Sequence, residues 1–91
     1  MKLVIEFDPV KDVINREKHG LSLAEADQLD WETLKSFNDE RVDYGENRQV
    51  GFAFKSRRLH AVVYTYRGMN LRIISLRKAN KRERKWYENQ K

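Results

Sequence analysis

The sequence predicts an α+β domain, spanning residues 1–91, in which helices cover one face of an antiparallel sheet. Three runs rich in β-forming residues follow one another over residues 48–76, separated by short polar turns. Helix-start signals precede these runs near the N-terminus, and another follows them near the C-terminus. With 91 residues, of which 40% are hydrophobic, the chain is large enough for one modest core.

The N-terminal segment is expected to form a strand and then a helix. The run LVIEF at residues 3–7 is rich in β-forming residues. Asp8 suits the N-cap of a helix, Pro9 suits its first position, and Gly20 suits its end. Apolar residues spaced three and four apart predict an apolar stripe along this helix. The residues of the stripe are Val10, Val13 and Ile14.

Two capping-box patterns predict the remaining helices. The motif SLAE at residues 22–25 starts a second short helix that runs to about Leu29. Asn80 followed by Glu83 starts a closing helix over residues 81–89. The expected order is therefore strand, helix, helix, four strands and helix.

The four later strands are expected to form a meander. TLKSF at residues 33–37 is typical of an edge strand, and a polar loop at 38–46 separates it from runs at 48–54, 59–66 and 70–76. Side chains of the middle run alternate between two faces of the sheet. The residues on one of these faces are His60, Val62, Tyr64 and Tyr66. We expect the sheet face away from the helices to be partly open and lined by basic and aromatic side chains.

Charge is divided unequally between the two halves of the chain. Residues 1–47 carry 6 Lys and Arg against 12 Asp and Glu, whereas residues 48–91 carry 13 against 2. No carboxylate occurs between Arg48 and Arg82. The basic half should therefore attract a polyanion. Its lack of clustered carboxylates disfavours a nuclease that works through two Mg²⁺ ions.

Other classes of protein are disfavoured by what the chain lacks. It has no cysteine, so neither a disulfide framework nor a cysteine-ligated zinc site can form. The start MKLVIEFDP has too short an apolar run for a signal peptide, and no run approaches the roughly 20 residues of a membrane span. We therefore expect a cytoplasmic protein with no membrane partner and no cofactor.

The basic half carries the side chains that nucleic-acid binding needs, namely cations for phosphates and aromatic rings for unpaired bases. The residues expected to contact RNA are Arg48, His60, Tyr64, Tyr66, Arg67 and Arg82. A non-catalytic RNA- or DNA-binding module requires nothing more than these. A surface for an acidic protein partner is a third alternative.

RNA cleavage without a metal ion is the catalytic alternative, and it requires a base, an acid and cations on the phosphate charge. Arginine grips phosphate through two donors, so Arg72 and Arg77, helped by Lys78, are expected to hold the scissile phosphate. Strict alternation sends Arg72 and Arg77 to opposite faces unless the strand ends or bulges near Leu76. The candidate proton carriers are Lys18, His19 and Glu46.

Two separate motifs resemble the BrnT family of bacterial type II toxins. The first is FDPVKDVINREKHGLSLAEA at residues 7–26, and the second is YRGMNLRIISLRKANKRERKWYE at residues 66–88. The matching positions of the first motif are Asn15, Lys18, His19, Gly20, Ser22, Glu25 and Ala26. Those of the second are Arg72, Ile73, Ile74, Ser75, Arg77, Lys78, Ala79, Arg82 and Glu83. Leu76 departs from the family pattern, in which alanine is commoner, while Glu46 and Arg48 lie near the usual Glu-x-Arg position.

The resemblance implies a RelE-like fold and a ribonuclease that blocks translation. It also implies a cognate antitoxin similar to BrnA, a ribbon-helix-helix DNA-binding protein. The complex of toxin and antitoxin would bind its own promoter DNA only through the antitoxin. RelE-like toxins rely on basic residues more than on a fixed catalytic triad, which agrees with the charge distribution of this chain.

Overall fold

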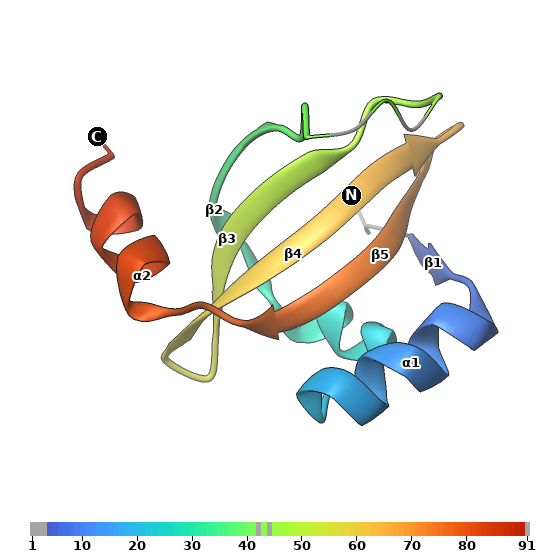
Figure 1. Ribbon diagram of the computed structural model, residues 1–91, viewed down its shortest axis with the longest axis horizontal. Helices are drawn as coiled ribbons and strands as arrows, with labels where there is room; N and C mark the ends of the chain where they lie inside the picture. Colours follow the sequence, from blue (N-terminus) through green and yellow to red (C-terminus); the bar gives the residue numbers. More distant parts are fainter. Residues whose placement is uncertain (1–3, 42, 44, 91) are drawn as a thin grey trace.

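A computed structural model describes residues 4–41, 43 and 45–90 of the chain, and within them five strands form one mixed sheet. The strands lie in the order β1-β5-β4-β3-β2 (Figure 1). Their bounds are β1 Ile5–Phe7, β2 Asp30–Asn38, β3 Gln49–Lys55, β4 Arg58–Arg67 and β5 Asn70–Lys78. The helical elements are α1 Pro9–His19, the 3-10 helix η1 Leu23–Gln28 and α2 Lys81–Glu88.

The predicted order of elements is confirmed, and β2 to β5 form the predicted antiparallel meander with β2 at its edge. β1 pairs in parallel with β5, which makes the sheet mixed. The predicted strand at residues 3–7 begins at Ile5, and residue 3 lies outside the described residues. The predicted second helix is a 3-10 helix.

Local capping signals set the ends of the helices as predicted. The Asp8 carboxylate accepts a hydrogen bond from the Val10 amide at 2.8 Å, and Gly20 ends α1 with a left-handed φ of 71°. The Glu25 carboxylate accepts from the Ser22 amide at 2.8 Å, which completes the capping box of η1. A second capping box starts α2.

The helices do not share one face of the sheet, so the expectation that they would is wrong. Figure 1 shows α1 and η1 together beside β1 and β5, with α2 standing apart from them. η1 buries Leu23 against a core that includes Val62, whereas α2 packs Trp86 against Phe52 and its neighbours. Because Phe52 and Val62 belong to opposite faces of the pleated sheet, α2 covers part of the face that was expected to be open.

A β-bulge interrupts the regular alternation of β5. Tyr64 pairs with Ile73, but the preceding residue of β4, Val63, pairs with Ser75. Ile74 is therefore the extra residue of β5 at this point. From Ser75 onward, the side chains of β5 point to the opposite face from the one that strict alternation assigns to them.

Candidate functional site

The bulge brings Arg72 and Arg77 to the same face of the sheet. Arg77 pairs with Ala61, whose side chain belongs to the cluster that α2 covers, and Arg72 pairs with Thr65 farther along β4. Ala61 and Thr65 share a face because they lie four residues apart in a strand that alternates regularly. Lys78 pairs with His60 on the opposite face, so it does not join Arg77.

Arg77 is held in place by Glu83 at the start of α2. Its Nη1 and Nη2 atoms donate to the two Glu83 carboxylate oxygens, each at 2.7 Å. This pairing raises the pKa of Arg77 and lowers the pKa of Glu83. The same carboxylate accepts from the Asn80 amide at 2.9 Å, so the capping box fixes the orientation of the guanidinium group.

The end of α1 lies against β5 beside the bulge. Lys18 and His19 line a cavity of about 300 Å³ together with Ile74 and Ser75. Burial and then the positive charges of Arg77 and Lys18 lower the pKa of His19 below its ordinary value of 6.5. His19 is therefore mainly neutral near pH 7 and can accept a proton.

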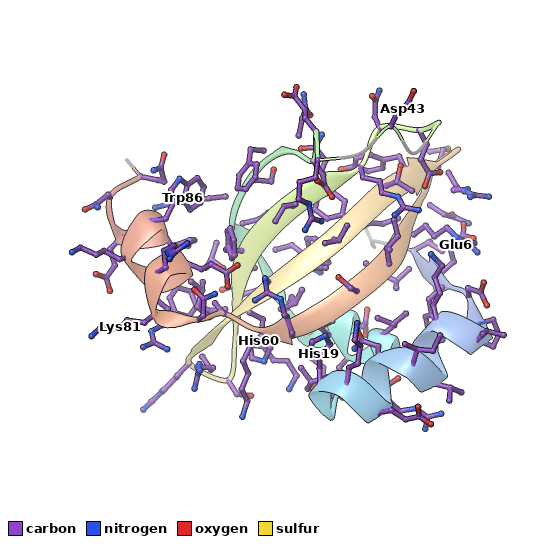
Figure 2. The ribbon with its side chains drawn as sticks, viewed as in Figure 1. Glu6, His19, Asp43, His60, Lys81 and Trp86 are labelled. Atoms are coloured by element: carbon purple, nitrogen blue, oxygen red, sulfur yellow. The ribbon has the colours of Figure 1, made fainter. Side chains whose placement is uncertain are left out.

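Ser75 connects this cavity to a larger pocket lined by Arg77 and Arg82. We define the Arg77 corner as Lys18, His19, Ser75 and Arg77. Figure 2 shows His19 beside β5. It contains a base with a lowered pKa and a guanidinium group held by a carboxylate. Both are side chains that the sequence predicted for this role, but their proximity depends on the bulge.

Asn15 attaches α1 to β5 and was not recognised from the sequence as a residue of the site. Its side chain is 4% exposed and makes two hydrogen bonds with the Leu76 backbone, accepting from the amide at 3.1 Å and donating to the carbonyl at 2.9 Å. It also donates to the Leu21 carbonyl at 2.8 Å. β1 pairs with β5 only as far as Ile73, so Asn15 takes the place of a neighbouring strand at Leu76.

A second group of candidates lies away from the Arg77 corner. Glu46 accepts from Arg48 at 3.0 Å and lies 3.5 Å from Arg67. The hydrogen bond from Arg48 lowers the pKa of Glu46, so this carboxylate is ionised and is a weak base. Arg72 donates to Glu6 of β1 at 2.8 Å.

His60 and Tyr64 do not line an open surface, so that expectation is wrong. Each is only 3% exposed, because the face they share is the one that η1 covers. The Tyr64 ring packs edge-on against Trp31 at 5.8 Å between centroids, and His60 Nδ1 lies 2.8 Å from the Arg58 carbonyl. Burial lowers the pKa of His60 and raises that of Tyr64. Tyr66 remains exposed.

Among residues 4–41, 43 and 45–90, no three His, Asp or Glu side chains are grouped so that they could hold a metal ion. In the same part of the chain, no helix combines the length and apolar character needed to cross a bilayer.

Comparison with known proteins gives one family. Residues 7–83 match a family model described as the ribonuclease toxin, BrnT, of a type II toxin-antitoxin system. The match extends from β1 to the first turn of α2, and it includes the bulge and the whole Arg77 corner. A search of curated proteins finds no match.

Proposed function

Because this chain belongs to the BrnT family of ribonuclease toxins of type II toxin-antitoxin systems, we propose that it cleaves RNA at the Arg77 corner. The observation that carries the proposal is the bulge, because it puts Arg77 on the same face as Ser75, which lines the cavity of Lys18 and His19. The meander with its flanking helices supports a RelE-like layout, and the family match supports a single toxin domain over most of the chain.

The proposed reaction is a transesterification that uses no metal ion. Neutral His19 takes the proton of a ribose 2′-hydroxyl, and the oxygen attacks the adjacent phosphorus. The O2′–P bond forms, the P–O5′ bond breaks, and the departing O5′ takes a proton from Lys18 or from water. The products are a 2′,3′-cyclic phosphate and a 5′-hydroxyl. Arg77 stabilises the charge that develops on the phosphoryl oxygens.

Arg77 keeps donors for a phosphate while Glu83 holds it. A guanidinium group has five N–H donors. Glu83 uses two of them, and the Lys78 carbonyl accepts another at 3.3 Å from Nη1. The other two donors make no hydrogen bond to any residue that the structure describes. The pairing with Glu83 orients them without occupying them.

Arg72 serves a different phosphate in this proposal. It lies five residues from Arg77, which is about 15 Å along a strand. Glu6 holds Arg72 toward β1, whereas Glu83 holds Arg77 toward α2. We therefore assign the two side chains to separate phosphates of one RNA strand, with Arg77 on the side of His19.

The biological setting that we propose also follows from the family. Cleavage of messenger RNA inhibits translation, and a cognate antitoxin of the BrnA type, a ribbon-helix-helix protein, neutralises the toxin. The complex binds promoter DNA through the antitoxin alone. Co-expression of such an antitoxin should restore growth to cells that produce this chain.

The test uses purified full-length protein and a single-stranded RNA labelled at its 5′ end. We expect cleavage to survive excess EDTA and to leave 2′,3′-cyclic phosphate or 3′-phosphate ends. Arg77→Ala should lower the rate by about 100-fold or more, and Arg77→Lys should recover only part of it. Arg57→Gly is the matched control, because it removes one arginine at a turn whose φ of 66° suits glycine.

Three results would contradict parts of this proposal. Activity that chelation abolishes and Mg²⁺ restores would overturn the metal-free reaction. A folded double variant, Arg72→Ala with Arg77→Ala, that still cleaved at the normal rate would place the active site elsewhere. Tight RNA binding with no cleavage under any condition would support the nucleic-acid-binding module instead.

A further inference from the structure

A pocket of about 410 Å³ opens beside the Arg77 corner, between α2, the end of β2 and the sheet. Three aromatic rings meet in it: Phe37 and Phe52 each lie 5.4 Å from Trp86 between ring centroids. Val50 and Val63 complete its apolar lining. Figure 2 shows Trp86 between α2 and the sheet. The pocket therefore offers flat apolar surfaces of the kind on which a planar ring stacks.

Phe37 is the most exposed of the aromatic residues that line this pocket. It is 45% exposed although it is a large hydrophobic residue, and it lies near the end of an edge strand. Its ring contacts both Phe52 and Trp86, which fixes its position without burying it. An exposed aromatic ring held in this way is a preformed stacking surface.

Charged groups surround the mouth of the pocket on two sides. Arg77 and Arg82 lie on the side of β5 and α2, where Arg77 keeps its paired position against Glu83. On the other side, Arg41 donates to both carboxylate oxygens of Asp39, each at 2.7 Å. The apolar lining is thus bordered directly by the guanidinium group that we assign to the phosphate.

We propose that this pocket binds one unpaired nucleobase of the RNA, the base of a nucleotide whose phosphate lies at Arg77. The inference rests on the proposed function and adds to it a site for a base. Ser75 and Arg77 lie on the same face two residues apart, about 6.6 Å along the strand. Ser75 lines both the pocket and the cavity of His19, so a base in the pocket places the adjoining ribose and phosphate toward the proton carrier.

An apolar side chain of a protein partner is the competing occupant. It would pack against the aromatic walls, but it has no negatively charged group to pair with Arg77 and Arg82 at the mouth. A nucleotide satisfies both parts, because its base stacks and its phosphate accepts hydrogen bonds from guanidinium groups. The combination of stacking walls with a phosphate-binding rim therefore favours the nucleobase.

The test follows the fluorescence of Trp86 during titration with nucleoside 5′-monophosphates. The chain has two tryptophans, so the Trp31→Phe variant leaves Trp86 as the sole reporter. We expect AMP, CMP, GMP or UMP to quench it saturably, and ribose 5-phosphate, which lacks a base, to leave it unchanged. Phe37→Ala in this background should weaken nucleotide binding by roughly 5- to 150-fold. Met69→Ala, at a side chain that is 90% exposed in a turn, should change nothing.

The outcomes separate this inference from the proposed function. Protein that cleaves RNA normally but shows no quenching by any nucleotide would overturn the base pocket and leave the ribonuclease intact. Quenching that Phe37→Ala abolishes, in protein that cleaves no RNA, would support the pocket and contradict the ribonuclease. Unchanged quenching in Phe37→Ala, together with lost binding of the antitoxin, would assign the pocket to a protein instead.

Discussion

Replacing Asn15 with alanine should destabilise the fold strongly, although the change removes only a few atoms. The substitution deprives the Leu76 amide of its acceptor and removes donors from the carbonyls of Leu76 and Leu21. A buried polar group left without a partner costs about 1–3 kcal/mol. Water entering the vacated space satisfies part of this need, so we expect a loss of about 3 kcal/mol rather than the full sum.

That loss is a large part of the stability of a small domain, which is about 5–15 kcal/mol. It corresponds to a fall in Tm of roughly 12–24 °C for a chain of this size. A thermal melt followed by circular dichroism measures it directly. Asn89→Ala is the matched control, because Asn89 is exposed at the end of α2, and its Tm should stay within a few degrees of the unaltered protein.

Asn15→Asp separates hydrogen bonding from packing. Aspartate has nearly the same shape, but its carboxylate cannot donate to the carbonyls of Leu21 and Leu76. We expect it to be at least as destabilising as alanine at neutral pH. Tm values for both variants close to that of the unaltered protein would refute the reasoning and show that Asn15 does not hold α1 against β5.

The remaining predictions concern pH and capping. The lowered pKa of buried His60 means that the unfolded chain binds more protons below pH 6.5, so stability is complete above that pH and falls as pH decreases. The Tm should therefore drop between about pH 7 and about pH 5, and His60→Gln should flatten this dependence in the same melts. If neutral His19 is the base, as we propose, the RNA cleavage rate should rise with pH to a plateau, and the midpoint of the rise should lie below the ordinary histidine pKa of 6.5. A pH–rate profile of His19→Gln should lack that inflection. Glu25→Ala should lose the hydrogen bond from the Ser22 amide and the ion pair with Lys55, whose Nζ lies 3.3 Å from the Glu25 carboxylate. The free energy of unfolding should fall by about 1 kcal/mol, and cleavage by the folded protein should not change.

The ends of the elements could be predicted because they depend on residues that are neighbours in the chain. Asp8 and Gly20 limit α1 through bonds to their own helix, and Asn80 with Glu83 starts α2 in the same way. Such interactions are local, so residue type and spacing are sufficient to indicate them. The alternation of β4 was predicted correctly for the same reason.

The buried face of α1 and the covered faces of the sheet could not be predicted, because burial depends on contacts between distant parts of the chain. The apolar stripe of α1, formed by Val10, Val13 and Ile14, is exposed, and α1 buries the polar Asn15 instead. Alternation placed His60 with Tyr64 correctly, but it could not show that η1 covers that side. No pattern in the sequence specifies the bulge at Ile74, since the run through it is uniformly suited to a strand.

The anchoring of α1 determines when, during synthesis of the toxin, the Arg77 corner can form. Asn15 and Leu76 are 61 residues apart, so the parts of the Arg77 corner come from opposite ends of the chain. During synthesis the N-terminal part emerges first, while the strand that anchors α1 is still missing. The corner can assemble only after Leu76 and Arg77 have been added and the long intervening loop has closed. If RNA is cut at this corner, as we propose, a chain that ends before Arg77 should have no cleavage activity.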